Sequence, residues 1–291
     1  MTALLRTEGI MKAYGGVQAL NGAEIEVEEG TVAGLIGPNG SGKTTLFNVI
    51  TGYERPDAGS VWFGGREITR MSPDKVFAVG IGRTFQLTKI FPRLTVIENM
   101  LVAAQAKDRP RNLLAWFGKD AWTHHRKHAM ELLGFVGIER HANVLAGSLS
   151  YGQRKLLELA YVLVADPAVI LLDEPAGGVN PTLINHIAAR IRELNAQGKT
   201  FLIVEHNMEF VMGLCSTVSV LESGACVASG PPDIIRTDKR VLDAYLGADL
   251  DEDEPAADKT AEDKLAADKP AADKPAEDNG DETKEGDDDR A

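Results

Sequence analysis

The sequence is poor in cysteine and has no long hydrophobic run. Its two cysteines, Cys215 and Cys226, show no metal-binding or redox spacing, and a reducing cytosolic compartment fits this usage. Glu158, Asp166 and Pro167 interrupt the best apolar run, so no segment approaches the ~18 residues of a membrane-spanning helix. The N-terminus lacks the charged start, apolar block and cleavage site of a signal peptide. We therefore expect that any work at a membrane depends on docking onto other subunits.

Net charge is absent from most of the chain. Residues 249–291 hold 18 of the 43 acidic and 6 of the 31 basic residues, so they account for the whole net charge of −12. The neutral remainder argues against a role in nucleic-acid binding. From Pro255 the sequence repeats every five residues, beginning with Pro-Ala-Ala-Asp-Lys, a composition too polar to offset the entropy of ordering. We predict a folded domain at 1–247 and a disordered, acidic, low-complexity tail at 248–291.

The stretch Gly37–Thr44 reads GPNGSGKT and fits the pattern G-x-x-x-x-G-K-[ST]. Its glycines let the backbone curl so that N–H groups point inward and form a nest for an anion. An apolar run of strand length, Thr31–Ile36, leads into the loop, and Thr45–Ile50 continues as a helix whose positive end faces the same point. This pattern predicts a nucleoside triphosphate site in which Lys43 reaches the β- and γ-phosphates and the Thr44 hydroxyl binds Mg²⁺.

A second phosphate-site element is the apolar run Val169–Leu172, which is followed by Asp173 and Glu174. A buried strand that ends in a carboxylate places Asp173 near the Mg²⁺. Glu174 lies one residue further on, where it can accept a proton from water attacking the γ-phosphate. An Asp-Glu pair alone is common at a solvated strand end, but the upstream phosphate loop favours the functional interpretation.

The remaining pattern predicts an α/β fold with an inserted helical part. Strands are expected at Leu4–Ala13, Glu24–Val27 and Ser60–Phe63, with turns at residues 15–16, 21–22 and 64–65. These strands would form an antiparallel β subdomain. After residue 169 strands and helices alternate, which indicates a parallel sheet. We therefore predict a P-loop NTPase (RecA-like) core, with a helical subdomain inserted at about 88–165.

The segment Leu149–Gln153 narrows this broad class. Ser150 is predicted to cap a helix over Tyr151–Val164, and Gly152 keeps its first turn free of side-chain bulk, so the helix end presents N–H groups to an anion. On its own this is a routine capped helix. Because it lies between the phosphate loop and the Asp173 strand, just ahead of the latter, it resembles the L-S-G-G-Q element of ATP-binding cassette (ABC) ATPases.

Other parts of that family's pattern occur in the same order, over about residues 4–228. Gln86, in Arg-Thr-Phe-Gln, stands where the family has a glutamine that senses Mg²⁺ and water. His206 matches the switch histidine that contacts the γ-phosphate, and Tyr14 lies at the position of the aromatic residue that stacks on adenine.

The resemblance implies a role for each matched residue. Catalysis would fall to Glu174, His206 and Gln86, and Mg²⁺ would be held by Thr44, Gln86 and Asp173. The residues expected to bind ATP are Tyr14, Gly37, Pro38, Asn39, Gly40, Ser41, Gly42, Lys43, Thr44 and Thr45 and, on the ATP of a partner cassette, Ser150, Gly152 and Gln153.

Two positions depart from the general family pattern. Tyr151 replaces the first glycine of the signature, and Asn180 stands where an inter-site aspartate is usual. An amide cannot carry that aspartate's charge, so we expect communication between the two ATP sites to be tuned differently.

The departures also identify a branch of the family. LSYGQ at 149–153, IGRTFQ at 81–86, DEPAGGVNP at 173–181 and VEHNM at 204–208 together look like cassettes of branched-chain amino acid importers, and VLDAYLG at 241–247 is similar to that branch's C-terminal segment. Cassettes for urea or short amides are close relatives, so the solute stays open.

The resemblance implies an ATP-hydrolysing importer subunit, peripheral at the cytoplasmic face of the inner or plasma membrane. Its partners would be a second cassette, identical or different, two membrane permeases that dock at about residues 86–105 and, indirectly, an extracytoplasmic solute-binding protein; no nucleic acid is expected. The competing interpretation is a soluble ABC ATPase acting on nucleic acid or ribosomes. Such proteins usually carry two cassettes or a long coiled coil, whereas this chain has one cassette and no heptad run.

Overall fold

The computed structural model describes residues 3–84, 90–107 and 119–241. By its contacts the chain divides into two units, 1–251 and 252–291, and all of the described residues belong to the first. Gln86, residues 108–118 and the predicted tail lie outside the described residues. Among the residues described, no helix is both long and apolar enough to cross a membrane.

The central element is a six-stranded sheet with the order β10-β9-β3-β8-β7-β6. All neighbouring strands in it run parallel except β9 and β10, which form an antiparallel hairpin. The strands are β3 (Val32–Ile36), β6 (Ile81–Arg83), β7 (Val169–Asp173), β8 (Thr200–Val204), β9 (Thr217–Glu222) and β10 (Ala225–Gly230). The carboxyl ends of the parallel strands therefore meet at one edge, where the phosphate loop follows β3, Asp173 ends β7 and His206 follows β8.

A second, four-stranded antiparallel sheet has the order β2-β1-β4-β5. Its strands are β1 (Ala3–Tyr14), β2 (Val17–Glu28), β4 (Ala58–Phe63) and β5 (Arg66–Glu67). The turn predicted at Asn21–Gly22 was wrong, because β2 runs through both residues. Gly22 (φ 77°) and Gly9 (φ 56°) instead bend the β1–β2 ladder, whose register shifts around them, as glycines do at β-bulges.

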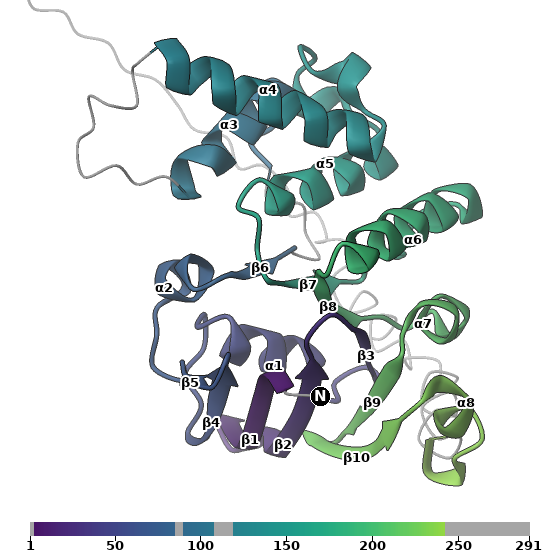
Figure 1. Cartoon of the computed structure of the whole chain (residues 1–291). Helices are drawn as coiled ribbons and strands as arrows, with labels where there is room; N and C mark the ends of the chain where they lie inside the picture. The colour runs from purple at the N-terminus through teal and green to yellow at the C-terminus, as the bar shows by residue number, and fades with distance from the viewer. Residues whose placement is uncertain (1–2, 85–89, 108–118, 242–291) are drawn as a thin grey trace, which may run out of the picture. The chain divides into compact units, whose positions relative to one another are not determined.

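The helical insertion follows β6. The helices α3 (Val96–Lys107), α4 (Lys119–Val136) and α5 (Tyr151–Leu163) pack against one another (Figure 1). Thr95 and Glu98 form a capping box, in which Thr95 N–H donates to Glu98 Oε2 (2.7 Å) and Glu98 N–H donates to Thr95 Oγ1 (3.3 Å). Two 3₁₀ turns, at Glu139–His141 and Ala146–Ser148, lead from α4 to α5.

The remaining helices are α1 (Lys43–Ile50), α2 (Pro73–Ala78), α6 (Pro181–Ala196), α7 (Met208–Leu214) and α8 (Pro232–Ile235). They and the insertion bury both faces of the six-stranded sheet. Alternate residues of β7 face opposite cores: Ile170 and Leu172 pack with the side of α6 and α7, and Val169 and Leu171 pack with α1 and the antiparallel sheet. Burial on both faces explains why β3, β7 and β8 read as continuous apolar runs. The α/β core, the antiparallel sheet and the helical insertion predicted from the sequence are confirmed.

Candidate functional site

The phosphate loop joins the end of β3 to the start of α1. Gly42, the residue before α1, has φ 100°, a left-handed conformation that glycine adopts without strain. A Cβ atom on Gly42 would collide with the carbonyl oxygen of Ala19, and one on Gly37 would collide with that of Leu221. These glycines therefore let the loop lie directly on neighbouring backbone.

The rest of the loop and the first turn of α1 carry the other predicted ligands. Asn39 and Gly40 are exposed at the tip, whereas Ser41 is buried and its carbonyl accepts the Gly224 N–H (3.0 Å). Thr44, an exposed residue, and Thr45 follow Lys43 in α1. The first turn of α1 thus places the helix N-terminus and two hydroxyl-bearing residues directly after the loop, as a phosphate site requires.

Lys43 reaches across the loop. Its Nζ donates to the carbonyl oxygens of Gly37 and Pro38, both at 2.8 Å. Burial lowers the pKa of Lys43, while the negative charges of Glu174 and Asp173 act in the opposite direction. The ammonium group of Lys43 is therefore close enough to Asp173 and Glu174, the two acidic residues predicted for the site, to interact with their charges.

Asp173 ends β7 with its side chain only 3% exposed, and it is paired with a buried arginine. Arg83, at the end of β6, donates from Nη2 to Asp173 Oδ2 at 2.9 Å, and from Nη1 to Asn48 Oδ1 at 2.7 Å. The Asp173 N–H also donates to Thr84 Oγ1 (3.1 Å). Residues at the end of β6 thus fix the position of the carboxylate, and Arg83 links it to α1.

Glu174 follows in a strained turn. Its φ is 48°, a left-handed conformation that costs a non-glycine residue about 1–3 kcal/mol unless its surroundings enforce it. Here the Glu174 N–H donates to Val204 O (2.9 Å), and its carbonyl accepts the Gly177 N–H (3.1 Å) and the Lys155 Nζ (3.3 Å). The backbone around Glu174 is therefore held from β8 and from α5.

His206 and Tyr14 complete the part of the site near the phosphate loop. The His206 side chain is 65% exposed and its Nδ1 lies 3.8 Å from Glu205 Oε2. Lys12 Nζ lies over the Tyr14 ring, 5.3 Å from its centroid. Burial raises the pKa of Tyr14, while the side chain of Thr45, next to the phosphate loop, acts in the opposite direction. Tyr14 is therefore linked to the loop although β1 carries it.

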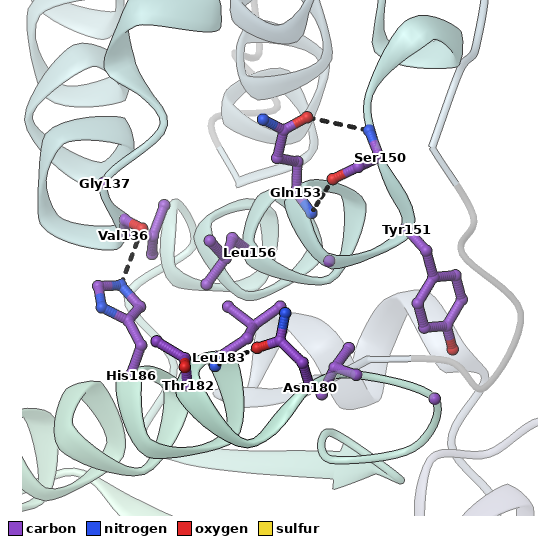
Figure 2. A pocket seen from close by; sticks show the side chains of 13 residues that line it. Val136, Gly137, Ser150, Tyr151, Gln153, Leu156, Asn180, Thr182, Leu183 and His186 are labelled. Carbon is purple, nitrogen blue, oxygen red and sulfur yellow. Dashed lines mark hydrogen bonds between the residues drawn. The ribbon is translucent and has the colours of Figure 1, made fainter.

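The predicted signature residues lie elsewhere, at the start of α5. Ser150 Oγ accepts the Gln153 N–H (3.3 Å), and Gln153 Oε1 accepts the Ser150 N–H (2.9 Å), as Figure 2 shows. A Cβ on Gly152 would collide with Leu183 of α6, so the missing side chain permits close packing of two helices. These residues line an open cavity of about 730 Å³ with parts of α4 and α6 but with no residue of the phosphate loop.

The two residues that depart from the family pattern have local structural roles. The ring of Tyr151 lies against Gly178, where a Cβ would come within 3.2 Å of it. Asn180 Oδ1 accepts the Leu183 N–H (2.9 Å), which makes Asn180 the N-cap of α6.

Two buried charged residues, Arg83 and Glu205, were quoted in the sequence motifs without being given a role, and a third, Lys155 of α5, was not singled out at all. A buried position of this kind is usually occupied by an apolar residue. The available signal was a charge at the end of an apolar strand, as in Phe-Leu-Ile-Val-Glu at 201–205. A buried charge needs partners, but the sequence does not name them.

Comparisons with known proteins agree with this geometry. The family model for the ABC transporter matches residues 20–177, more than half of the chain, and that for the branched-chain amino acid ATP-binding cassette transporter matches residues 226–251. The high-affinity branched-chain amino acid transport ATP-binding protein BraF of Pseudomonas aeruginosa is 37% identical over 249 residues, which are 84% of this chain and 98% of BraF. LivG of Escherichia coli K12, with the same description, is 34% identical over equal shares.

Solved structures show the same architecture. An ABC-transporter cassette in its ADP conformation has a TM-score of 0.75 and 36% identity, covering 85% of this chain and 100% of its own. A cassette solved as a dimer bound to ADP and Pi has a TM-score of 0.69 and 25% identity, covering 78% and 98%.

Replacing Gly42 with alanine should weaken ADP binding about 100-fold, or about 2.7 kcal/mol. Alanine is strained at this φ and its Cβ meets the Ala19 carbonyl. Titration with a fluorescent ADP analogue measures the change. Gly213→Ala, in α7 with no atom within 4 Å of its Cβ, is the control and should bind normally. A loss of less than threefold in Gly42→Ala would contradict the steric argument.

Replacing Arg83 with methionine should lower the free energy of unfolding by about 3–5 kcal/mol, because it leaves the Asp173 carboxylate buried without its partner. Urea denaturation measures this difference. Arg240→Met, which breaks the exposed pair with Asp238, should leave the unfolding midpoint unchanged. Equal midpoints for the two variants would show that Asp173 does not depend on Arg83.

Proposed function

Because the chain belongs to the ABC transporter family, we propose that it is the ATP-hydrolysing subunit of an importer for branched-chain or related amino acids. The observation that carries this proposal is the convergence of the phosphate loop, Asp173, Glu174 and His206 at one edge of the sheet. The amino acid assignment rests on the match at 226–251 and on relatives such as BraF. A urea or short-amide cassette is the alternative.

ATP would bind along this edge. The adenine would stack on Tyr14, whose other face carries the Lys12 ammonium, and the phosphates would occupy the nest formed by residues 37–45. Lys43 would leave the loop carbonyls and pair with the β- and γ-phosphates, because a phosphate charge is the stronger acceptor.

The residues present suit Mg²⁺, since a hard cation prefers oxygen ligands. Thr44 is exposed on the first turn of α1, and the Asp173 carboxylate is held in place by Arg83; Gln86 would add an amide oxygen. When bound, the ion neutralises charge on the β- and γ-phosphates.

Glu174 would take the proton from the attacking water, and His206 would hold the γ-phosphate and that water. The enforced left-handed turn at Glu174 fixes where its side chain leaves the backbone. The exposed His206 ring stands at the end of the neighbouring strand β8, so both can reach the same phosphate.

A second cassette would complete each site. The capped N-terminus of α5, with Ser150, Gly152 and Gln153, lines no cavity with this chain's own phosphate loop. Its N–H groups suit a γ-phosphate held by another molecule. ATP between two cassettes would then hold them together until hydrolysis removes that contact. A relative is known as a dimer bound to ADP and Pi.

The permease would dock beside α3. Phe91 and Leu145 are about half exposed, and the segments that carry them are joined by the Thr95–Leu145 bridge. Asn99, fully buried, holds Phe91 by accepting its N–H (2.8 Å) and donating to its carbonyl (3.1 Å). Exposed apolar side chains on a rigidly bonded backbone favour a protein contact.

The limits and the location of the cassette complete the proposal. The cassette would span residues 1–247, with 248–291 as an acidic tail that takes no part in the ATP site. It would lie on the cytoplasmic face of the membrane, held there by the permeases, with no nucleic-acid partner.

Glu174→Gln should reduce ATP turnover to background, because the amide cannot accept the proton from water, and it should leave ATP affinity within about threefold of wild type. Phosphate release and nucleotide titration measure the two quantities. Glu193→Gln, an exposed change on α6, is the control. Turnover near the wild-type rate would remove Glu174 from the role of general base.

Phe91→Asp combined with Leu145→Asp should release the chain from the permeases while leaving its nucleotide affinity unchanged, since a charge in an apolar contact is unpaired and desolvated. Pull-down with the permeases after detergent extraction is the measurement. Gln105→Asp, exposed on α3, should bind as wild type does. Normal recovery of the double variant would place the dock elsewhere.

Uptake in the source organism tests the solute. Deleting the chain should abolish the energy-dependent uptake of radiolabelled leucine, isoleucine and valine, and a wild-type copy but not Glu174→Gln should restore it. Loss of urea or amide uptake instead would favour the alternative.

A further inference from the structure

Glu205 is a fully buried carboxylate that directly follows β8, and its relative exposure is 0%. The next residue is His206, and across the sheet edge lies the turn that follows β7. Fully buried glutamates are rare unless they are paired, so the bonds around this side chain show why it is there.

The two oxygens of Glu205 bind the backbone of two different loops. Oε1 accepts the Ala176 N–H at 2.6 Å, in the loop after β7. Oε2 accepts the His206 N–H at 3.1 Å and the Asn207 N–H at 3.3 Å, in the loop after β8. One rigid carboxylate therefore joins the loop that contains Glu174 to the loop that contains His206.

This bridge suits an ionised carboxylate and no other side chain of its size. Burial raises the pKa of Glu205, whereas the three N–H bonds and the nearby His206 ring act to lower it. A glutamine would keep the shape and one accepting oxygen, but its NH₂ group would face N–H donors on one of the two loops. Glutamine at this position would therefore lose the hydrogen bonds to one of the two loops, and the side chain would no longer connect them.

Both loops begin in the interior and end at the surface. Pro175 and Ala176 are buried, whereas Gly178 and Asn180, further along the same loop, are exposed, as is the His206 side chain. A partner that displaces Gly178 or Asn180 would therefore also displace Ala176, which is two to four residues away and is bonded to Glu205. Glu205 is in turn bonded directly to the backbone of His206.

We propose that Glu205 is a positioning residue that holds His206 and the loop from Glu174 to Asn180 as one unit, so that a second cassette docking on that loop also sets the position of His206. This inference rests on the proposed function, because it assumes that ATP is hydrolysed in a site completed by another cassette. Glu205 would act through the backbone of these two loops.

The first test is Glu205→Gln in the full-length chain. We expect ATP affinity within about threefold of wild type, since the phosphate loop is untouched, and a fall in kcat of about tenfold or more with little change in KM. The NMR signal of the His206 ring should shift, and it should no longer respond to ATP-driven dimerisation. Glu209→Gln, an exposed glutamate on α7, is the control and should match wild type in all of these.

The outcomes separate this inference from the proposed function. If the wild-type chain neither hydrolyses ATP nor dimerises with it, the proposed function fails. If the wild type is active and Glu205→Gln keeps kcat within twofold and an unshifted His206 signal, Glu205 is not a positioning residue.

A second measurement uses only the wild type, in case Glu205→Gln does not fold. Amide hydrogen exchange at Ala176 and His206 should be slow, and the two amides should have equal protection factors relative to the unfolded chain, because one carboxylate protects both. Protection factors that differ by more than about tenfold would show that the loops open independently and would overturn the proposal.

Discussion

This structure depends on one constraint, which is that charged side chains lie buried where the parallel strands of the sheet end. Each buried charge there needs partners, and the partners are what shape the loops. Asp173 is held by Arg83, Lys43 by the carbonyls of its own loop, and Glu205 by the N–H groups of Ala176, His206 and Asn207. Satisfying these groups fixes the backbone from which the predicted catalytic side chains project.

The same constraint explains what could be predicted from the sequence. The phosphate loop, the capped start of α5 and the strand ending in Asp173 are local patterns, and the structure contains all of them. Partners distant in sequence were not predictable, such as Arg83 for Asp173, because many polar residues compete for each buried charge. Local propensity also failed at Asn21–Gly22, where pairing of β2 along β1 overrides a good turn sequence. Gln86 lies outside the described residues, so its role stays a prediction.

The candidate site divides between two surfaces, and this division carries the functional argument. Lys43, Asp173, Glu174 and His206 lie at one edge of the six-stranded sheet, and Tyr14 ends β1 of the antiparallel sheet. Ser150 and Gln153 instead lie at the start of α5 and line a cavity that contains no residue of the phosphate loop. The ring of Tyr151 connects that helix end to the loop after Glu174 by lying against Gly178, and Asn180, at the end of the same loop, caps α6. A nucleotide bound between two such chains would therefore contact the phosphate loop of one chain and the start of α5 in the other. Its binding would then be coupled to movement of the two chains relative to each other.

Identifying the proteins that travel with the full-length chain tests the central claim most directly. The chain would carry an N-terminal tag, native membranes would be solubilised gently, and the recovered proteins identified by mass spectrometry. Our account predicts a pair of polytopic membrane subunits and a second cassette, either another copy of this chain or a related one. Recovery of ribosomal or DNA-repair proteins, with nothing from the membrane, would contradict the transport assignment while leaving the ATPase assignment intact.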